Sequence, residues 1–157
     1  MTSLLRRADD LLGAISPSIP LLVLRIALAI PFYRSGLTKW DGFFQLSGGA
    51  RYLFTSEFQL HLLGATYPYP APILAAHLAG IAEIVLPVLL VLGLCTRFAA
   101  LGLLAMTAVI QVTIPDGWAN FHLPWAAMAL ALVTFGGGRI ALDAWLPSFQ
   151  ASAKPSS

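Results

Sequence analysis

Four long apolar runs, separated by shorter polar stretches, dominate the pattern of hydrophobic and polar positions along the chain. They lie near Ile19–Leu37, Ile73–Leu94, Phe98–Ile114 and Phe121–Gly137. Each run approaches the roughly 20 helical residues that are needed to cross a hydrocarbon core about 30 Å thick. Pro124 interrupts the fourth run in its first turn, where a missing N–H is tolerated. The pattern therefore predicts an all-α membrane protein, a bundle of four transmembrane helices.

The composition agrees with a membrane protein. Hydrophobic residues make up 58% of the 157 residues and charged residues only 10%, and the mean hydropathy is +0.80, outside the range of soluble globular domains. The net charge of +2 does not indicate nucleic-acid binding, because the basic residues are scattered among apolar runs and form no basic stripe. The single cysteine, Cys95, excludes an internal disulfide and a CxxC redox motif.

The distribution of basic residues predicts how the helices are oriented. Lysine and arginine residues outside the runs lie mostly on one predicted side of the membrane (Arg6, Arg7, Arg97, Arg139 and Lys154), with Lys39 and Arg51 on the other. The richer side is expected to be cytoplasmic. Arg25 interrupts the first run and no small-residue cleavage site follows it, so the first helix is expected to remain uncleaved. We therefore expect a cytoplasmic N-terminal segment (1–18), a membrane domain (19–143) and a cytoplasmic tail (144–157).

The long connection between the first two runs, residues 39–72, is predicted to lie on the outer face. Gly48 and Gly49 break it, and the following segment ARYLFTSEFQLHLL, residues 50–63, mixes apolar and polar residues as an interfacial helix does. Five aromatic residues fall near the predicted outer boundary: Trp40, Tyr52, Tyr67, Tyr69 and Trp118. An aromatic belt explains them without a ligand site.

Four ionisable side chains lie within the runs themselves: Arg25, Arg34, His77 and Glu83. A charged group at mid-bilayer costs roughly 2.5 to 3.5 kcal/mol on insertion scales, so each is expected to face protein or water and to have a partner. These four residues are therefore the candidates for an intramembrane polar site.

Glu83 is the strongest of these candidates, because it lies near the middle of the second run. Ala76, Gly80 and Glu83 recur at helical spacing, and small residues allow a neighbouring helix to approach closely. Pro87 removes the N–H that would bond the carbonyl of Glu83. Two interpretations remain open: a carboxylate paired with an arginine to fix helix contacts, and a site for a proton, an ion or a head group.

Helix geometry favours Arg34 over Arg25 as the partner of Glu83. Side chains on a helix lean toward its N-terminus, so Arg34 on the outward-running first helix and Glu83 on the inward-running second helix lean toward each other. Arg25 lies about 9 Å from the cytoplasmic end of its helix and can extend its guanidinium to the inner head groups. The two arginines are about half a turn out of phase, so only one of them is expected to face the second helix unless Pro31 kinks the first.

The three histidines, His61, His77 and His122, fall on the outer side in this topology. His77 precedes Glu83 by six residues, about 120° around the helix, so the two do not share a face. No HxH or HxxxH spacing is present. We therefore expect local hydrogen bonds rather than a metal site, with a haem or copper site as the less favoured alternative.

Three segments together resemble the DoxX family of small four-helix membrane proteins. They are RIALAIPFYRSGLTKW on the first helix, AEIVLPVLLVLGLCTRFAALGLL across the second and third, and the closing GGGRIALD. The resemblance covers roughly residues 20–143. Its matching positions are Arg25, Gly36, Lys39, Glu83, Gly93, Arg97 and Asp143. Arg34 and His77 lie outside the family pattern.

The resemblance implies an accessory subunit of a quinone-linked oxidoreductase in the bacterial inner membrane. The chain has no flavin, haem or iron–sulfur motif, so we expect it to lend a quinone pocket or a docking surface to a partner protein of a redox complex, with no covalently bound cofactor. A small proton-linked carrier that uses Glu83 and a structural assembly factor remain alternatives. An apolar cavity beside Glu83 would favour the quinone role, a water-lined path the carrier, and a fully packed core the structural role.

Overall fold

Four long helices form the body of the protein in a computed structural model that describes residues 2–146. They are α2 (Ser18–Leu37), α4 (Pro72–Leu92), α5 (Thr96–Thr113) and α6 (Leu123–Phe135), and a shorter helix, α1 (Thr2–Gly13), precedes them. Pro124 stands in the first turn of α6, as predicted. The described part of the chain is mostly helical, in agreement with the sequence pattern.

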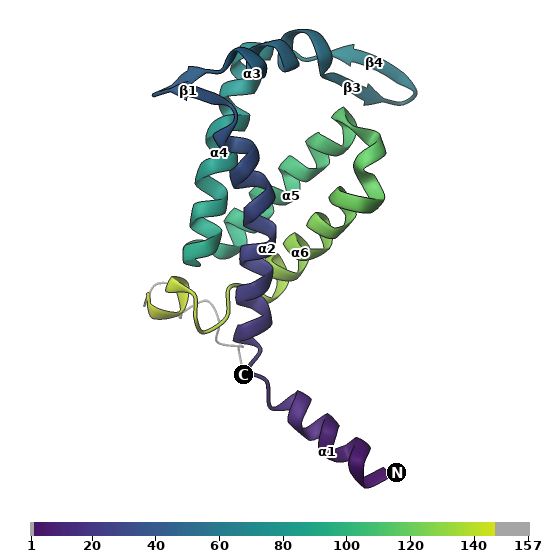
Figure 1. The fold of residues 1–157 in the computed structure, drawn as a ribbon, viewed down its shortest axis with the longest axis vertical. Helices are drawn as coiled ribbons and strands as arrows, with labels where there is room; N and C mark the ends of the chain where they lie inside the picture. Colours follow the sequence, from purple (N-terminus) through teal and green to yellow (C-terminus); the bar gives the residue numbers. More distant parts are fainter. Residues whose placement is uncertain (1, 147–157) are drawn as a thin grey trace, which may run out of the picture.

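Leucines, a phenylalanine and alanines form the core of the bundle. Helix α2 packs against α4, and α5 packs against both α4 and α6 (Figure 1). The buried core residues are Leu28, Phe32, Leu90, Ala99, Ala100, Leu103, Ala129 and Leu132. The alanines lie on α5 and α6, where small side chains let two helices approach closely.

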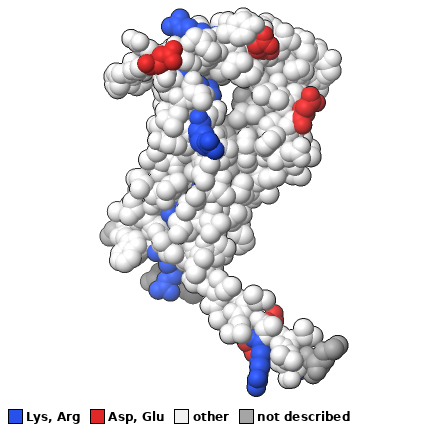
Figure 2. All heavy atoms as spheres, in the orientation of Figure 1, with Lys and Arg blue, Asp and Glu red and all other residues white. Residues whose placement is uncertain are grey.

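The surface of the bundle is that of a protein immersed in lipid. Helices α2, α4 and α5 are long and apolar enough to cross a membrane by length and composition. Helix α6 has 13 residues, but a π-helical turn, η3 (Trp118–His122), continues into it, and a 3-10 turn, η2 (Pro115–Gly117), precedes that. Figure 2 shows charged side chains mainly toward the two ends of this face, with a mostly uncharged band between them. Because apolar side chains face outward along the helices, the chain is an integral membrane protein.

The connection between α2 and α4 folds over one end of the bundle (Figure 1). It contains β1 (Trp40–Gly42), β2 (Gln45–Leu46), α3 (Gly48–Tyr52), the π-helical turn η1 (Leu53–Glu57), β3 (Gln59–Leu62) and β4 (Ala65–Pro68). Strands β1 and β2 pair antiparallel, as do β3 and β4. The Trp40 indole packs on Gly80, where an added Cβ would come within 2.7 Å of the ring. Ala76 packs with Leu46, Ala50 and Phe54. The part of the small-residue face of α4 that carries Ala76 and Gly80 therefore packs against this connection and not against another long helix.

The interfacial helix predicted over residues 50–63 is only partly present. Helical structure ends at Glu57, because Phe58 is extended (φ −75°, ψ 128°). The chain then forms the β3–β4 hairpin, whose two-residue turn is Leu63 and Gly64, both with positive φ (52° and 82°). A hairpin this tight favours positive φ at both positions. Leucine rarely adopts that conformation, so Gly64 alone marks the turn in the sequence.

The start of α2 and the chain that follows α6 meet at the opposite end of the bundle (Figure 1). After α6, Gly136 and Gly138 turn the chain with positive φ, 75° in each case, and a 3-10 turn, η4 (Leu142–Trp145), follows. The backbone N–H of Arg139 donates to the hydroxyl of Ser18 at the start of α2, 3.0 Å away. An even number of membrane crossings would leave the N-terminal and C-terminal segments on the same side of the membrane. Lys154 and most of the predicted tail 144–157 lie outside the described residues.

Candidate functional site

A buried ion pair joins the turn after α2 to the middle of α4. The Lys39 ammonium nitrogen lies 2.5 Å from a carboxylate oxygen of Glu83, and the two side chains are 12% and 6% exposed. The same ammonium donates to the hydroxyl of Ser35, 3.1 Å away. Among the residues that the structure describes, this is the one ion pair. Both of its charges are shielded from lipid, as an intramembrane charge requires.

The predicted arginine partner of Glu83 is wrong. Arg34 is exposed and has no ion-pair or hydrogen-bond partner within residues 2–146, and Arg25 binds elsewhere. Helix α2 ends at Leu37, so Lys39 lies two residues beyond its C-terminal end. The Lys39 side chain extends back along α2, past Ser35, and reaches the Glu83 carboxylate, which leans toward the N-terminus of α4. Lys39 lies beyond the predicted run Ile19–Leu37, so helix geometry within the runs does not include it.

Backbone hydrogen bonds hold Lys39 in place. Its N–H donates to the carbonyl of Gly36, 3.2 Å away, and its carbonyl accepts from the N–H of Ser47, 2.9 Å away. The Ser47 hydroxyl donates to the carbonyl of Thr38, 3.0 Å away. That hydroxyl also accepts from the N–H of Ala50 and caps α3. The connection over the bundle therefore holds the lysine in one position. A side chain that is fixed in this way is suited to a binding site.

Gly36 brings the two helices together beside the pair. A Cβ added at Gly36 would lie 3.0 Å from the Cβ of Glu83 and 2.9 Å from a side-chain carbon of Ile84. Real Cβ atoms do not tolerate such contacts without a shift of the neighbouring helix. The glycine therefore sets the distance between α2 and α4 at the depth of Glu83.

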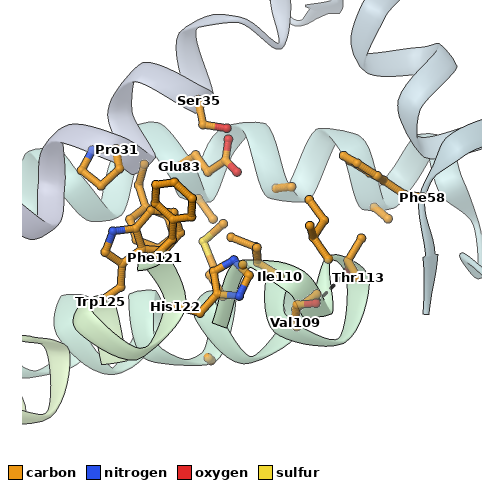
Figure 3. A pocket seen from close by; sticks show the side chains of 18 of the residues that line it. Pro31, Ser35, Phe58, Glu83, Val109, Ile110, Thr113, Phe121, His122 and Trp125 are labelled. Atoms are coloured by element: carbon orange, nitrogen blue, oxygen red, sulfur yellow. Dashed lines mark hydrogen bonds between the residues drawn. The ribbon is translucent and has the colours of Figure 1, made fainter. Parts of the chain in front are cut away.

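A cavity of about 980 Å³ opens beside the ion pair. Lys39, Glu83 and Ser35 contribute polar atoms to its wall, while Phe54 and Phe58 from the connection line it together with residues of α2, α4, α5, η3 and α6. Figure 3 shows Glu83 near the upper wall and Phe121, Trp125 and His122 on another wall. The lining is mostly apolar and aromatic, which is the usual character of a small-molecule site.

The His122 imidazole, from η3, also lines this cavity and is held by Gln111 of α5. His122 is 3% exposed, and its Nδ1 lies 2.6 Å from the amide oxygen of Gln111. The amide nitrogen of Gln111 donates to the carbonyl of Pro115, 3.2 Å away, so the amide oxygen is free to accept from the imidazole. Nδ1 then carries the proton, and Nε2 of the neutral ring is an acceptor. A Cβ at Gly117 would come within 2.5 Å of the ring, so glycine is needed there.

The cavity thus has polar side chains on two of its walls, the Lys39–Glu83 pair on one and His122 on the other. An ammonium group has three N–H donors, and Lys39 uses two of them on Ser35 and Glu83. The third remains for a ligand oxygen, and His122 can accept from a hydroxyl group. Between these contacts the aromatic side chains provide flat apolar surface.

Arg25 belongs to a second cluster at the opposite end of the bundle. Its guanidinium donates to the carbonyls of Leu90 (2.9 Å), Val91 (2.6 Å) and Gly137 (3.0 Å), and the residue is 2% exposed. Leu90 and Val91 are in the last turn of α4, whose carbonyls lack partners within the helix. Arg25 therefore caps α4 and ties it to the chain that follows α6, and the predicted extension to the head groups is wrong.

Asp143 completes this cluster by capping α5. Its carboxylate accepts from the N–H groups of Cys95 (2.7 Å) and Thr96 (2.8 Å), and its own N–H donates to the carbonyl of Gly93 (2.9 Å). Gly93 has φ +72°, and a Cβ there would lie 2.6 Å from Ala141. These residues hold the tight turn between α4 and α5, so they have a structural role.

The remaining sequence candidates form contacts away from the cavity. Arg97 donates to the carbonyl of Val133 near the end of α6, 3.1 Å away. The Nδ1 of His77 lies 2.8 Å from the carbonyl of Ile73 in its own helix, and that of His61 lies 3.2 Å from the carbonyl of Val112. Within the described residues no group of three or more His, Cys, Asp or Glu side chains could hold a metal ion.

Three residues of the site, Ser35, Gln111 and Gly117, are not among the candidates that the sequence offers. Ser35 precedes Lys39 by four residues, a spacing that places both near one face of α2, and this signal could have found the pair. Gln111 and His122 lie on either side of the α5–α6 turn. The sequence marks His122 only as one of three histidines that are expected to form local hydrogen bonds, and it gives no signal for the contact with Gln111. Gly117 is recognisable only from its contact with the imidazole.

Comparison with known proteins identifies relatives of the chain. The DoxX family model matches residues 20–116. An uncharacterized protein of Haemophilus influenzae is 30% identical over 147 residues, which cover 86% of this chain and 88% of that protein. No solved structure matches the chain. Six of the seven predicted family positions fall in the two clusters described above, and Arg97 caps the end of α6.

Proposed function

The chain belongs to the DoxX family of membrane proteins, and on this premise we propose that it binds a membrane quinone or quinol in the cavity beside Lys39 and Glu83. In this proposal it serves as an accessory subunit of a quinone-linked oxidoreductase. Four helices cross the bacterial inner membrane, both ends lie in the cytoplasm, and the cavity lies toward the outer face. A partner protein supplies the redox centre that completes electron transfer.

One observation carries the proposal: an apolar cavity of about 980 Å³ lies against a buried lysine–glutamate pair. Ligand sites of drug-like molecules span roughly 300–1,000 Å³ and combine apolar walls with a few placed polar groups. A quinone head group is a flat ring with two oxygens, and the Lys39 ammonium can donate to one of them. A quinol hydroxyl can also donate to Nε2 of His122.

The ion pair suits a ligand that is neutral. With Lys39 and Glu83 compensating each other, the site carries no net charge that would have to be balanced by the ligand. Because water is scarce there, a single additional hydrogen bond discriminates strongly between a ring with an oxygen at the right position and one without it. Affinity then derives largely from the apolar surface of the ring and its tail.

The alternative roles have less support. A proton-linked carrier that uses Glu83 would need a polar path along the bundle, whereas the cavity wall is mainly apolar and aromatic. A purely structural role accounts for the ion pair but gives no reason for a large cavity next to it. The quinone role uses both features.

Photolabelling tests the proposal. An azido-quinone is added to the purified protein in nanodiscs, irradiated, and the labelled peptides are mapped. We expect label on the cavity-lining segments of α4 and α5, competed by unmodified quinone and reduced in the double variant Lys39→Met/Glu83→Leu. Arg34→Met, which removes a charge outside the cavity, is the matched control. Label spread evenly over the lipid-facing surface, and unchanged in the double variant, would refute quinone binding.

The accessory-subunit part has its own test. Purification in a mild detergent should recover a second protein that carries a flavin, haem or iron–sulfur group in a fixed ratio to this chain. A protein that remains free of such partners at native expression levels would contradict that part while leaving the binding site untouched.

A further inference from the structure

Helix α1 stands apart from the bundle and carries an apolar face that nothing in the described chain covers. It runs away from the end of the bundle at which α2 begins (Figure 1), and every residue from Ser3 to Gly13 is exposed. The exposed fractions of its leucines are 75% for Leu4, 65% for Leu5, 73% for Leu11 and 67% for Leu12. Such exposure of large apolar side chains is costly in water.

The sequence of α1 separates apolar from charged residues around the helix. At 100° per residue, the four leucines and Ala8 fall within an arc of about 120°. Arg6, Arg7, Asp9 and Asp10 occupy the remaining circumference. The helix is therefore amphipathic, although its 12 residues are too few to cross a bilayer.

The short link between α1 and α2 restricts the distance of the apolar face from the start of α2. Four residues, 14–17, link it to α2, which begins at Ser18. Fully extended, four residues span at most about 14 Å. Since α2 is long and apolar enough to cross a membrane, its first residue is expected at the membrane boundary, and α1 cannot move far from that surface. Ile15 in the linker is also 51% exposed and extends the apolar face toward α2.

We propose that α1 is an in-plane membrane anchor, a helix that lies in the head-group region with Leu4, Leu5, Ala8, Leu11 and Leu12 in the acyl boundary. Arg6 and Arg7 lie on the polar side, where they face phosphate groups, while Asp9 and Asp10 face water. Balanced charges on the polar face mean that the apolar face supplies most of the binding. The anchor holds the start of α2 at a fixed depth.

The membrane anchor does not depend on quinone binding. A lipid surface is favoured over a protein partner because of the short link between α1 and α2. The tether keeps the apolar face beside lipid whether or not another protein is present. A second copy of the chain would also bring its α1 to the same surface, but it would have to compete with lipid that is already in contact.

Two single-cysteine variants test the anchor. In a Cys95→Ser background, Ala8→Cys lies in the middle of the apolar arc, and Asp10→Cys lies about 200° around the helix from it. Both positions are exposed, so neither variant disturbs the bundle. Each full-length variant is labelled with an environment-sensitive fluorophore and placed at one copy per nanodisc of phosphatidylethanolamine and phosphatidylglycerol.

We expect a blue-shifted emission from position 8 that nitroxide-bearing lipids quench, and a water-like, unquenched emission from position 10. Adding Leu11→Asp should move the emission at position 8 toward that of water. Equal emission and equal quenching at both positions would overturn the anchor. Burial of position 8 only in discs with two labelled copies, together with a disulfide between two copies of the unlabelled Ala8→Cys variant, would assign the face to a second copy and would likewise overturn it.

Discussion

The Lys39 ammonium lies 2.5 Å from the Glu83 carboxylate, although the two residues are 44 positions apart in the chain. One belongs to the turn that leaves α2 and the other to the middle of α4. The contact therefore fixes the C-terminal end of α2 to the interior face of α4. It also places a donor group at the wall of the large cavity.

Disrupting this pair should destabilise the protein in a way that identifies the partners. Lys39→Met leaves a buried carboxylate without its counter-charge, a change that typically costs about 3 to 5 kcal/mol. In a double-mutant cycle with Glu83→Gln, measured by unfolding in detergent, the coupling energy should exceed about 0.5 kcal/mol. Arg34→Met paired with Glu83→Gln should give none. Coupling with Arg34 and not with Lys39 would contradict the pairing.

Arg25 should be intolerant of a conservative change. Its guanidinium bonds three carbonyls, and the single ammonium of a lysine cannot reproduce that geometry. We expect Arg25→Lys to lower the free energy of unfolding by about 2 kcal/mol or more, since a hydrogen bond from a charged group contributes roughly 1.5 to 3 kcal/mol. The matched variant Arg97→Lys alters one bond of an exposed residue and should cost less than about 1 kcal/mol. Equal losses would show that Arg25 is not a cap.

Asp143 should protect the first backbone N–H groups of α5. Asp143→Ala removes the acceptor of the Cys95 and Thr96 N–H groups, and losing a helix cap typically costs about 1 kcal/mol. Hydrogen exchange at these two amides should become faster, while exchange near Leu103 in the middle of α5 changes little. Unchanged protection at Cys95 and Thr96 would refute the cap.

The proposed orientation can be read from two serines at opposite ends of the molecule. Ser16 in the linker after α1 and Ser56 in η1 are both exposed. In a Cys95→Ser background, Ser56→Cys should react with an impermeant thiol reagent in spheroplasts, and Ser16→Cys should react only in inverted vesicles. The reverse pattern would invert the topology. Thr96, which is 1% exposed, is unsuitable for such labelling.

Much of the bundle follows from hydrophobic periodicity. The predicted run Ile19–Leu37 corresponds to α2 (Ser18–Leu37), because the lengths of membrane helices are set by the bilayer. The interior face of α4 also follows from spacing: Ala76, Gly80 and Glu83 are buried at intervals of four and three residues. In these cases local sequence and environment demand the same structure.

The site itself depended on contacts that sequence spacing does not encode. Lys39 reaches Glu83 because the connection over the bundle folds back and Ser47 fixes the turn. The β3–β4 hairpin has Leu63 at a turn position that favours glycine or asparagine. Because leucine does not signal a turn, the mixed apolar and polar pattern of residues 50–63 indicated a helix. His122 enters the cavity because Gly117 leaves room for its ring. Each of these is a tertiary contact between segments that are apolar or mixed in sequence.

Quinone binding in the cavity is the central claim, and Trp125 provides a probe within it. Trp125 lines the cavity, while the other three tryptophans, Trp40, Trp118 and Trp145, can each be replaced by phenylalanine. A bound quinone should quench the remaining emission, because the ring would lie next to the indole. Titration in nanodiscs separates binding from partition into lipid, since binding saturates and partition does not.

The decisive measurement is this titration in the single-tryptophan protein and in its Lys39→Met/Glu83→Leu and Arg34→Met versions. The account predicts saturable quenching of Trp125 in the parent and in Arg34→Met, with an apparent Kd raised about tenfold in the double variant, equivalent to one lost hydrogen bond of about 1.4 kcal/mol. Quenching that rises linearly with quinone concentration and is identical in all three proteins would contradict it.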